Sequence, residues 1–336
     1  MSKVYEALLR HPELLTGTTT VLGAEADLPG AWASAVKEKH VSLQTWNLQT
    51  AEAWKAAGCS EQQIHFGLPE PAALKDRNII LLWPKAKDFA RALVQMLSQV
   101  TSQCYIVAAN DTGGKSVNTA IKAQSDSCIK TDSARHCTLW QVTLTSSDEA
   151  VNWLKLARSV RFEERDFMTL PGVFGHGKLD AGTAQLLEHV PAPGHGRILD
   201  LGCGSGIIGL TMKGRNPSLK ATLSDVDAFA LRSAQLNSVR MGLEADILPS
   251  DGLKDIEGRF DIIYSNPPFH QGKQTDYDFA RRLFSDARKH LTRDGQLWIV
   301  ANRHLAYEEW AKEAFRQAEI MVQANGFKVI CVSEPT

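Results

Sequence analysis

The chain has 336 residues, of which 43% are hydrophobic, enough for about two globular domains with a buried core in each. Lysine and arginine number 37 against 38 aspartates and glutamates, with 16 against 15 in residues 1–160 and 21 against 23 in the remainder. Neither half therefore has the strong basic excess typical of a nucleic-acid-binding protein, so any such surface must be a local patch.

The six cysteines are scattered, without a C-x2-C pair or a Cys/His cluster at metal-ligand spacing. We interpret them as reduced, mostly buried thiols of a cytoplasmic protein, and we expect no metal site. The amino terminus shows helical periodicity broken by charge, and no segment approaches 18 consecutive apolar residues. These patterns predict neither export nor a membrane span.

The first half alternates short apolar runs with helical patterns, from residue 19 to about residue 144. The patterns predict strands at residues 20–23, 78–83 and 104–109 and a helix at residues 88–97. This half is therefore an α/β domain in its own right.

A more polar segment, residues 146–164, separates the two halves. We interpret it as a linker with a boundary near residue 160, which divides the chain into domains of residues 1–160 and 161–336. A glycine-rich segment that begins at Met168 follows it and leads into a helix expected at residues 181–190.

The second half contains a longer alternation of strands and helices. Strands are predicted at residues 197–201, 221–225, 245–248, 262–264 and 296–301, and helices at residues 207–213, 229–240 and 277–290. Strands separated by helices of this length form right-handed βαβ units. The predicted fold class is α/β with two tandem Rossmann-like domains, each a mostly parallel twisted sheet with helices on both faces.

The two halves also resemble each other. Asp88-Phe-Ala-Arg recurs as Asp278-Phe-Ala-Arg, and Ile106-Val-Ala-Ala-Asn recurs as Ile299-Val-Ala-Asn, at offsets of 190 and 193 residues. Two matches in the same order suggest a duplication; the alternative is chance similarity between two helix-strand units. The first half lacks a Gly-x-Gly-x-Gly turn after its opening strand, so a duplicated copy has lost the chemistry of the second.

A glycine-rich turn follows the first strand of the second half and reads Asp200-Leu-Gly-Cys-Gly-Ser-Gly. Gly202, Gly204 and Gly206 let the backbone turn tightly and approach a ligand closely. A dinucleotide or phosphate site is the obvious rival. However, Asp200 would repel a pyrophosphate, whereas it could accept hydrogen bonds from a cationic amino-acid group.

Two further acids stand at the ends of the next two strands. Asp225, which precedes Val226, can accept from both ribose hydroxyls of a nucleoside, and Asp251, which precedes Gly252, can accept from an adenine amino group. For each acid alone, a solvated loop carboxylate or a helix cap is the alternative. Together with the glycine turn, the three acids predict a site for S-adenosylmethionine. Phe174 is expected to close over this cofactor or to lie in the core.

An Asn-Pro-Pro-Phe loop follows the strand at residues 262–264. Neither Pro267 nor Pro268 can donate to a sheet ladder, so the strand must end by Asn266. The rigid loop would hold the Asn266 side chain and the Pro267 carbonyl as acceptors beside the ring of Phe269. A planar substrate could stack on that ring while the acceptors hold its amino hydrogens, so these four residues are the catalytic candidates. The alternative is a plain Pro-Pro turn after an edge strand.

On these motifs, residues 170–332 resemble the class I S-adenosylmethionine-dependent methyltransferases that modify planar amino groups. The resemblance is closest to the RsmC family, which has a degenerate amino-terminal twin. It rests on Leu170-Pro-Gly-Val-Phe, Leu179-Asp180, Asn266-Pro-Pro-Phe-His, Ile299-Val-Ala-Asn, Gly326-Phe-Lys-Val and, in the first half, Lys130-Thr-Asp-Ser-Ala-Arg-His-Cys. The resemblance implies a monomeric enzyme that methylates N2 of a guanine in 16S rRNA, with the 30S subunit as its partner.

The implied mechanism is in-line attack of the exocyclic nitrogen on the sulfonium methyl, with Asn266 and the Pro267 carbonyl holding the amino hydrogens. Three alternatives remain open at this point. One is the related RlmG family, which acts on 23S rRNA, and another is methylation of adenine N6 or of a protein glutamine. The third, of a different class, is an RNA-binding ribosome assembly factor.

The first half is expected to be a non-catalytic domain that positions RNA. Trp83-Pro-Lys stands where the second half has Asn-Pro-Pro, so no acceptor for an amino group remains there. A local basic patch is predicted from residues near strand ends and loops: Trp83, Lys85, Lys87, Lys115, Lys130 and Arg135. The alternative is that these cations are merely solvated and the half only shields or stabilises its partner.

Overall fold

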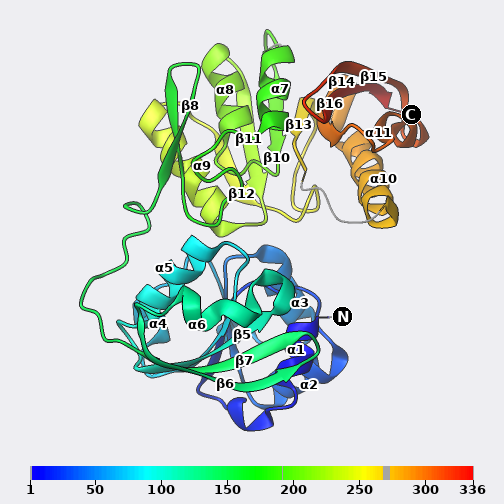
Figure 1. Cartoon of the computed structure of the whole chain (residues 1–336). Helices are drawn as coiled ribbons and strands as arrows, with labels where there is room; N and C mark the ends of the chain where they lie inside the picture. The colour runs from blue at the N-terminus through cyan, green and yellow to red at the C-terminus, as the bar shows by residue number, and fades with distance from the viewer. Residues whose placement is uncertain (1, 191, 268–272, 336) are drawn as a thin grey trace. The chain divides into compact units, whose positions relative to one another are not determined.

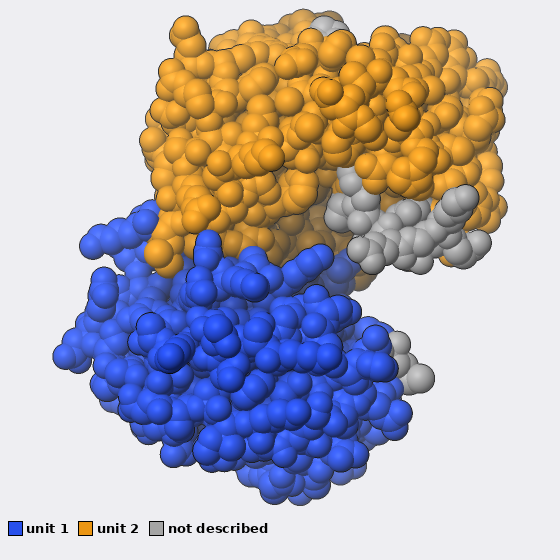
Figure 2. Space-filling model, in the orientation of Figure 1, with its two compact units in different colours: residues 1–155 blue, residues 156–336 orange. Residues whose placement is uncertain are grey.

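The computed structural model describes residues 2–190, 192–267 and 273–335. The chain divides into two compact units, residues 1–155 and 156–336 (Figure 2). In the described part of the chain, no helix is both long and apolar enough to cross a membrane.

The first unit contains a seven-stranded sheet in the order β3-β2-β1-β4-β5-β7-β6, of which Figure 1 labels β5, β6 and β7. Strands β1 to β5 are parallel, whereas β7 is antiparallel to both β5 and β6. The strands are β1 (Thr19–Leu22), β2 (Ser42–Thr45), β3 (Ile64–Phe66), β4 (Asn78–Leu82), β5 (Gln103–Ala109), β6 (Ser125–Ala134) and β7 (Cys137–Leu144). The helices are α1 (Lys3–Leu8), α2 (Gly30–Glu38), α3 (Leu48–Ala56), α4 (Pro71–Leu74), α5 (Lys87–Leu97) and α6 (Val117–Ala120).

The second unit repeats this order as β12-β11-β10-β13-β14-β16-β15. Its sheet strands are β10 (Arg197–Leu201), β11 (Lys220–Asp225), β12 (Asp246–Pro249), β13 (Phe260–Ser265), β14 (Leu291–Asn302), β15 (Phe315–Ala324) and β16 (Phe327–Pro335). Its helices are α7 (Ala181–His189), α8 (Ile207–Arg215), α9 (Ala228–Met241), α10 (Lys273–His290) and α11 (Tyr307–Trp310). The predicted class, two tandem Rossmann-like domains of mostly parallel strands, is confirmed. The repeated Asp-Phe-Ala-Arg motif lies in α5 and α10, and the repeated Ile-Val-Ala motif lies in β5 and β14, which supports a duplication.

The second sheet is buried on both faces. Successive side chains of a strand point to opposite faces, so Ile198 of β10 packs with α7 and α8 while Leu199 packs with α10. Strands covered by helices on both faces must be apolar almost throughout. This explains why β10 and β13 could be identified from short apolar runs, each ending where the polar site residues begin.

The segment predicted as a linker is not irregular throughout. Residues 158–162 form strand β8 (Arg158–Phe162), which pairs antiparallel with β9 (Arg165–Thr169). The turn consists of Glu163 and Glu164, both with positive φ, and lacks the Asn-Gly or Asp-Gly pair that normally signals such a hairpin. The linker prediction was therefore wrong for these residues, because the hairpin strands are largely exposed and only Val160, Phe167 and Thr169 of them are buried.

A buried asparagine joins this hairpin to the rest of the second unit. The Asn237 side chain accepts from the Met168 N–H at 2.7 Å and donates to the Met168 and Ser205 carbonyls, both at 2.9 Å. Asn237 is completely buried, and three of its four hydrogen-bonding positions are thereby used. The segment before α7 and the glycine-rich turn after β10 are thus held to the same turn of α9.

Candidate functional site

The predicted polar residues lie at the carboxyl ends of four neighbouring parallel strands. Asp200 lies near the end of β10, Asp225 is the last residue of β11, and Asp251 lies two residues beyond β12. Asn266 directly follows β13. Because β12, β11, β10 and β13 are adjacent and parallel, their ends meet at one edge of the sheet, where open α/β sheets bind ligands.

The glycine turn borders open space. Gly202 and Gly204 have φ of 72° and 55°, and a Cβ atom built on either would meet no other atom within 4 Å. A Cβ on Gly206 would instead lie 2.8 Å from Leu223 Cδ2, so this glycine lets α8 pack closely on the sheet. The first two glycines therefore leave room for a ligand against the backbone, and the third serves packing.

The Asp225 carboxylate is held by backbone donors beside this turn. Its Oδ2 accepts from the Gly204 N–H at 2.8 Å, and its Oδ1 accepts from the Asp227 N–H at 3.0 Å. Burial raises the pKa of Asp225, and these backbone hydrogen bonds oppose the rise. The Val226 N–H also acts on this carboxylate, which has about four acceptor positions, so a position remains for a ligand in a side chain that is still half-buried.

Asp200 lies beneath the glycine turn and is completely buried. Its Oδ2 accepts from the Gly209 N–H at 2.8 Å, whereas its Oδ1 is buried without a partner in the described structure. Burial raises the pKa of Asp200 to about 7, and the nearby Asp225 charge contributes to the rise. The expected contact of Asp200 with a cationic group of the cofactor stays a prediction. Oδ1 is the atom that could accept a hydrogen bond from such a group.

The Asn266 amide is held in one orientation. Its Nδ2 donates to Asp180 Oδ2 at 2.9 Å and to Thr183 Oγ1 at 2.8 Å. An ionised carboxylate can only accept, so the amide nitrogen must face Asp180 and the amide oxygen must point away from it. That oxygen, Oδ1, is buried and has no partner among the described residues. The arrangement therefore presents an acceptor for a donor supplied by a ligand.

Asp180 is a site residue that the sequence did not identify by role. It is the N-cap of α7, where its Oδ2 accepts from the Thr183 N–H at 2.9 Å. The capping could be read from an Asp with Thr three residues later before a helical pattern. Its contact with Asn266, 86 residues away, has no local signal. One side chain thus both starts α7 and orients the amide.

The remaining predicted site residues differ in what the structure describes. Pro267 is buried, while Pro268 and Phe269 lie outside the described residues. Phe174 is 68% exposed, which excludes the alternative that it belongs to the core. Val226 and Asp251 are half-buried, and Gly252 is exposed with a φ of 63° and open space around it. Whether any of them contacts a cofactor stays a prediction.

The described residues of the first unit do not repeat Asp200, Asp225 and Asn266 at the corresponding strand ends. Trp83 directly follows β4, as Asn266 follows β13, but only 7% of it is exposed. The expectation that Trp83 belongs to a surface patch was therefore wrong, because its ring packs inside the unit. The cations of that predicted patch are exposed, namely Lys85, Lys87, Lys115, Lys130 and Arg135.

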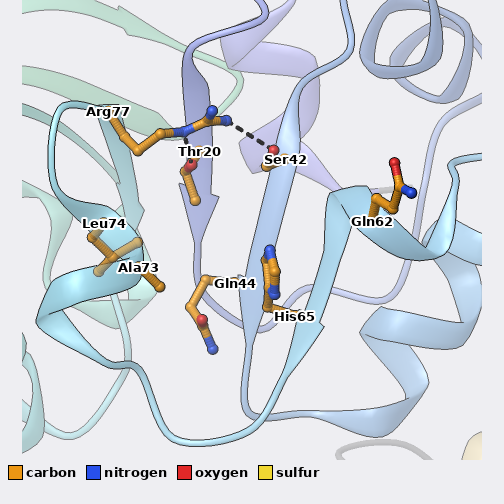
Figure 3. Close-up of a pocket in the computed structure, with 8 residues that line it drawn as sticks. All are labelled: Thr20, Ser42, Gln44, Gln62, His65, Ala73, Leu74 and Arg77. Atoms are coloured by element: carbon orange, nitrogen blue, oxygen red, sulfur yellow. Dashed lines mark hydrogen bonds between the residues drawn. The ribbon is translucent and has the colours of Figure 1, made fainter.

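A hollow of about 150 Å³ lies elsewhere in the first unit, lined by residues of β1, β2 and β3 and of α4 (Figure 3). Arg77, just before β4, donates to Thr20 Oγ1 at 2.9 Å and to Ser42 Oγ at 2.8 Å. These contacts lie near the beginnings of the strands, whereas Asp200 and Asn266 lie near strand ends. The hollow is therefore not a counterpart of the site in the second unit.

Two family models match nearly the whole chain. The family described as Methyltransferase small domain matches residues 164–331, and the family described as Methyltransferase small domain N-terminal matches residues 5–159. The first range covers the second sheet up to residue 331, within β16, and the second range contains the whole first sheet.

Curated relatives extend over the full length. The protein named Ribosomal RNA small subunit methyltransferase C from Pseudomonas syringae pathovar tomato is 36% identical, with 96% of this chain and 97% of the relative covered. The protein of the same name from Pseudomonas fluorescens is also 36% identical, with the same coverage. Among solved structures, the T. thermophilus 16S rRNA N2 methyltransferase RsmC, in complex with AdoMet and guanosine, matches with a TM-score of 0.81 at 21% identity, covering 99% of this chain and 92% of that one. These findings confirm the family and the fold that the motifs predict.

The raised pKa of Asp200 predicts how stability depends on pH. An aspartate in an unfolded chain has a pKa of about 3.9, whereas the pKa of Asp200 in the folded chain is raised to about 7. Between these pH values the folded state binds more protons than the unfolded state. Asp200 therefore makes the free energy of unfolding fall as pH rises through this window, and it causes no further fall at higher pH. The side chain of the Asp200→Asn variant is neutral at every pH. This variant should therefore avoid a loss of up to about 4 kcal/mol in the free energy of unfolding.

Urea unfolding of the wild type and of Asp200→Asn between pH 5 and pH 8.5 measures this difference. Relative to the wild type, the variant should gain stability up to about pH 7 and then stay level. Asp246→Asn, at an exposed position of β12, is the matched control and should follow the wild type. Parallel curves for Asp200→Asn and the wild type would mean that Asp200 ionises like a surface aspartate.

Proposed function

The chain belongs to the ribosomal RNA small subunit methyltransferase C family, and on that premise we propose that it transfers a methyl group from S-adenosylmethionine to N2 of a guanine in 16S rRNA. The observation that carries the proposal is the buried, unpartnered Asn266 Oδ1 at the end of β13. An exocyclic amino group is the kind of donor that satisfies such an acceptor.

Several features of the second unit fit the cofactor. Gly202 and Gly204 leave open space against the backbone, and Asp225 keeps an acceptor position for a ribose hydroxyl. Asp200 has an unused oxygen, which suits the positive charge of an amino-acid group. We assign adenine recognition to Asp251 and place Val226, Gly252, Gly206 and Phe174 around the same ligand. When bound, S-adenosylmethionine supplies an electrophilic methyl group on a sulfonium.

The chain's own residues prepare the amino group for transfer. Asn266 Oδ1 and the Pro267 carbonyl each accept one amino hydrogen, which turns the nitrogen lone pair out of the plane of the base and toward the methyl donor. Neither acceptor is a strong base. The proton leaves to water or to a nearby acceptor as the new bond forms, because the nitrogen becomes acidic only then. Pro268 and Phe269, outside the described residues, are assigned to the rigid loop and to stacking on the extruded base.

Substrate and partner follow from the family rather than from the amino acceptor alone. An unpartnered carbonyl oxygen also suits adenine N6 or a glutamine amide, whereas the curated relatives share a name that specifies small-subunit rRNA methylation. We therefore place the enzyme in the cytoplasm as a monomer that acts on 16S rRNA within the 30S subunit. The 23S rRNA alternative and the assembly-factor alternative are not favoured.

We further assign catalysis to residues 161–336 and RNA positioning to residues 1–160. The first half has no Gly-x-Gly-x-Gly turn, and the buried Trp83 follows the strand whose counterpart ends at Asn266. It thus lacks a cofactor turn and has no amide acceptor at the position that corresponds to Asn266. Calorimetry should give one S-adenosylmethionine per chain, and a value of two would contradict this division of roles.

The proposed reaction is tested with labelled S-adenosylmethionine. Naked 16S rRNA, 30S subunits and 50S subunits from cells that lack the protein are the substrates, and the modified nucleoside is identified by mass. We expect N2-methylguanosine at one position of 16S rRNA in the 30S subunit, and label on naked 16S rRNA alone would contradict the assignment to the assembled subunit. Label in 23S rRNA, or N6-methyladenosine as the product, would show that the substrate assignment is wrong.

The cofactor assignment predicts the effect of removing one carboxylate. Asp225→Ala should weaken S-adenosylmethionine binding by about 1.5–3 kcal/mol, the usual contribution of hydrogen bonds to a charged group. Calorimetry measures the affinity, and circular dichroism checks that the fold is intact. Asp246→Ala, on the neighbouring strand but exposed, is the control. An unchanged affinity for Asp225→Ala removes this residue from the cofactor site.

The amide assignment predicts a loss of chemistry without a loss of cofactor. Asn266→Ala should reduce single-turnover methyl transfer by on the order of 10²–10³, as for one positioned polar group, and keep cofactor affinity within a few-fold. Asp180→Ala should cause a smaller loss, because Thr183 still accepts from the amide. Asp180→Asn, which keeps an acceptor oxygen, should restore part of the rate. Near-normal turnover by Asn266→Ala would contradict the proposed role of the amide in methyl transfer.

A further inference from the structure

A second hollow, of about 330 Å³, lies in the second unit away from the predicted site. It is lined by Arg259, Arg288, Lys289, Thr292, Arg293 and Pro335. Four of these six residues are cations, and none of the described residues that line the hollow is an aspartate or a glutamate. The whole chain carries a net charge of only −1, so this concentration of positive charge is local.

Three consecutive elements bring these cations together. Arg259 directly precedes β13, Arg288 and Lys289 belong to the last turn of α10, and Arg293 belongs to the beginning of β14. Arg259 is fixed, since its Nη1 donates to the Leu291 carbonyl at 2.6 Å. The helix carboxyl terminus beside them favours cations, which helps to hold the group in place.

The charges around the hollow suit an anion. Like charges repel, and a bound anion removes that repulsion while releasing counterions from a polyanionic partner. The one ion pair described for Lys289 is with Asp286, at 2.8 Å, and both side chains are at least half exposed. Such a pair contributes at most about 1 kcal/mol, so Lys289 can exchange Asp286 for a phosphate at little cost.

The hollow is remote from the amino acceptor. Arg259 precedes β13 and Asn266 follows it, so the two lie roughly 23 Å apart along a strand of six residues. This length corresponds to several nucleotides of an RNA backbone, whose phosphates follow one another every few ångströms. A phosphate bound here cannot belong to the target nucleotide, and S-adenosylmethionine carries no phosphate.

We propose that the hollow lined by Arg259, Arg288, Lys289 and Arg293 binds backbone phosphates of the RNA, several nucleotides from the methylated base. The inference rests on the proposed function, because it takes RNA as the polyanion. It assigns to the catalytic unit a contact that holds the substrate independently of the base it modifies. A free phosphate or mononucleotide has the same chemistry, and the experiment separates the two sources.

The test uses the full chain with Lys289 and Arg293 both replaced by Gln, since Arg259 is structurally engaged. Binding of an unmethylated 16S rRNA transcript is measured between 50 and 200 mM salt. Each lost phosphate contact lowers the slope of log K against log salt by about 0.7–0.9. Wild-type affinity should therefore fall roughly ten-fold more over this range than that of the variant. If the double variant does not fold, the single variant Arg293→Gln replaces it. The slope should then change by half as much.

Two controls separate this site from diffuse charge. Arg232→Gln with Arg240→Gln removes two exposed cations of α9, which packs on the opposite face of the sheet, and should leave the wild-type slope. Lys289→Arg with Arg293→Lys keeps both charges and should also retain it. Equal losses for the α9 pair and the hollow pair would overturn the proposal, because any surface cation would then serve.

The remaining outcomes are equally decisive. Cofactor affinity and the rate at saturating RNA should be unchanged in the variant, while its KM for 16S rRNA rises at 150 mM salt. Equal salt slopes for the wild type and the variant overturn the proposal. If, in addition, millimolar inorganic phosphate raises the melting temperature of the wild type only, the hollow is a free-phosphate site. A wild type that binds 16S rRNA without methylating the 30S subunit contradicts the proposed function, while its salt slopes still test the hollow.

Discussion

The second unit depends on the hydrogen bond from the Gly204 N–H to the Asp225 carboxylate. This contact ties the turn after β10 to the end of β11, so the glycines keep their positive φ angles next to open space. Burial of Asp200 under the same turn, with its Oδ2 bonded to the Gly209 N–H, fixes the start of α8. Two carboxylates on neighbouring strands thus shape one loop. Burial disfavours the ionised form of both acids, and the pKa values of Asp200 and Asp225 are raised as a result.

The Asn266 amide is held in the same way, by groups that are themselves anchored. Asp180 is held as a helix N-cap, Thr183 lies one turn further along α7, and both receive hydrogen bonds from Asn266. In the proposed role of Asn266, this anchoring would leave little reorganisation for substrate binding, which is the property that makes a positioned dipole effective in catalysis. The amide oxygen left over is an acceptor that the fold does not satisfy, and each such group in a native structure calls for an explanation.

Much of this could be predicted from the sequence because the signals are local. β10 was predicted with its observed bounds, Arg197–Leu201, since an apolar run ends there at a glycine turn. Hairpin β8–β9 was missed because its turn is Glu-Glu and its strands are largely exposed. The contact between Asp180 and Asn266 was missed for another reason. It joins residues 86 positions apart, and only the packing of α7 against the sheet brings them together.

The two units differ in what their interiors contain. In the described part of the first unit no aspartate, glutamate, lysine, arginine or histidine is buried, whereas the second unit encloses Asp200 and also Lys328, which is paired with Glu308. A domain that encloses fewer charged groups loses less free energy to their desolvation. The first unit is also synthesised first, so it can fold before the residues that enclose Asp200 and Lys328 have left the ribosome.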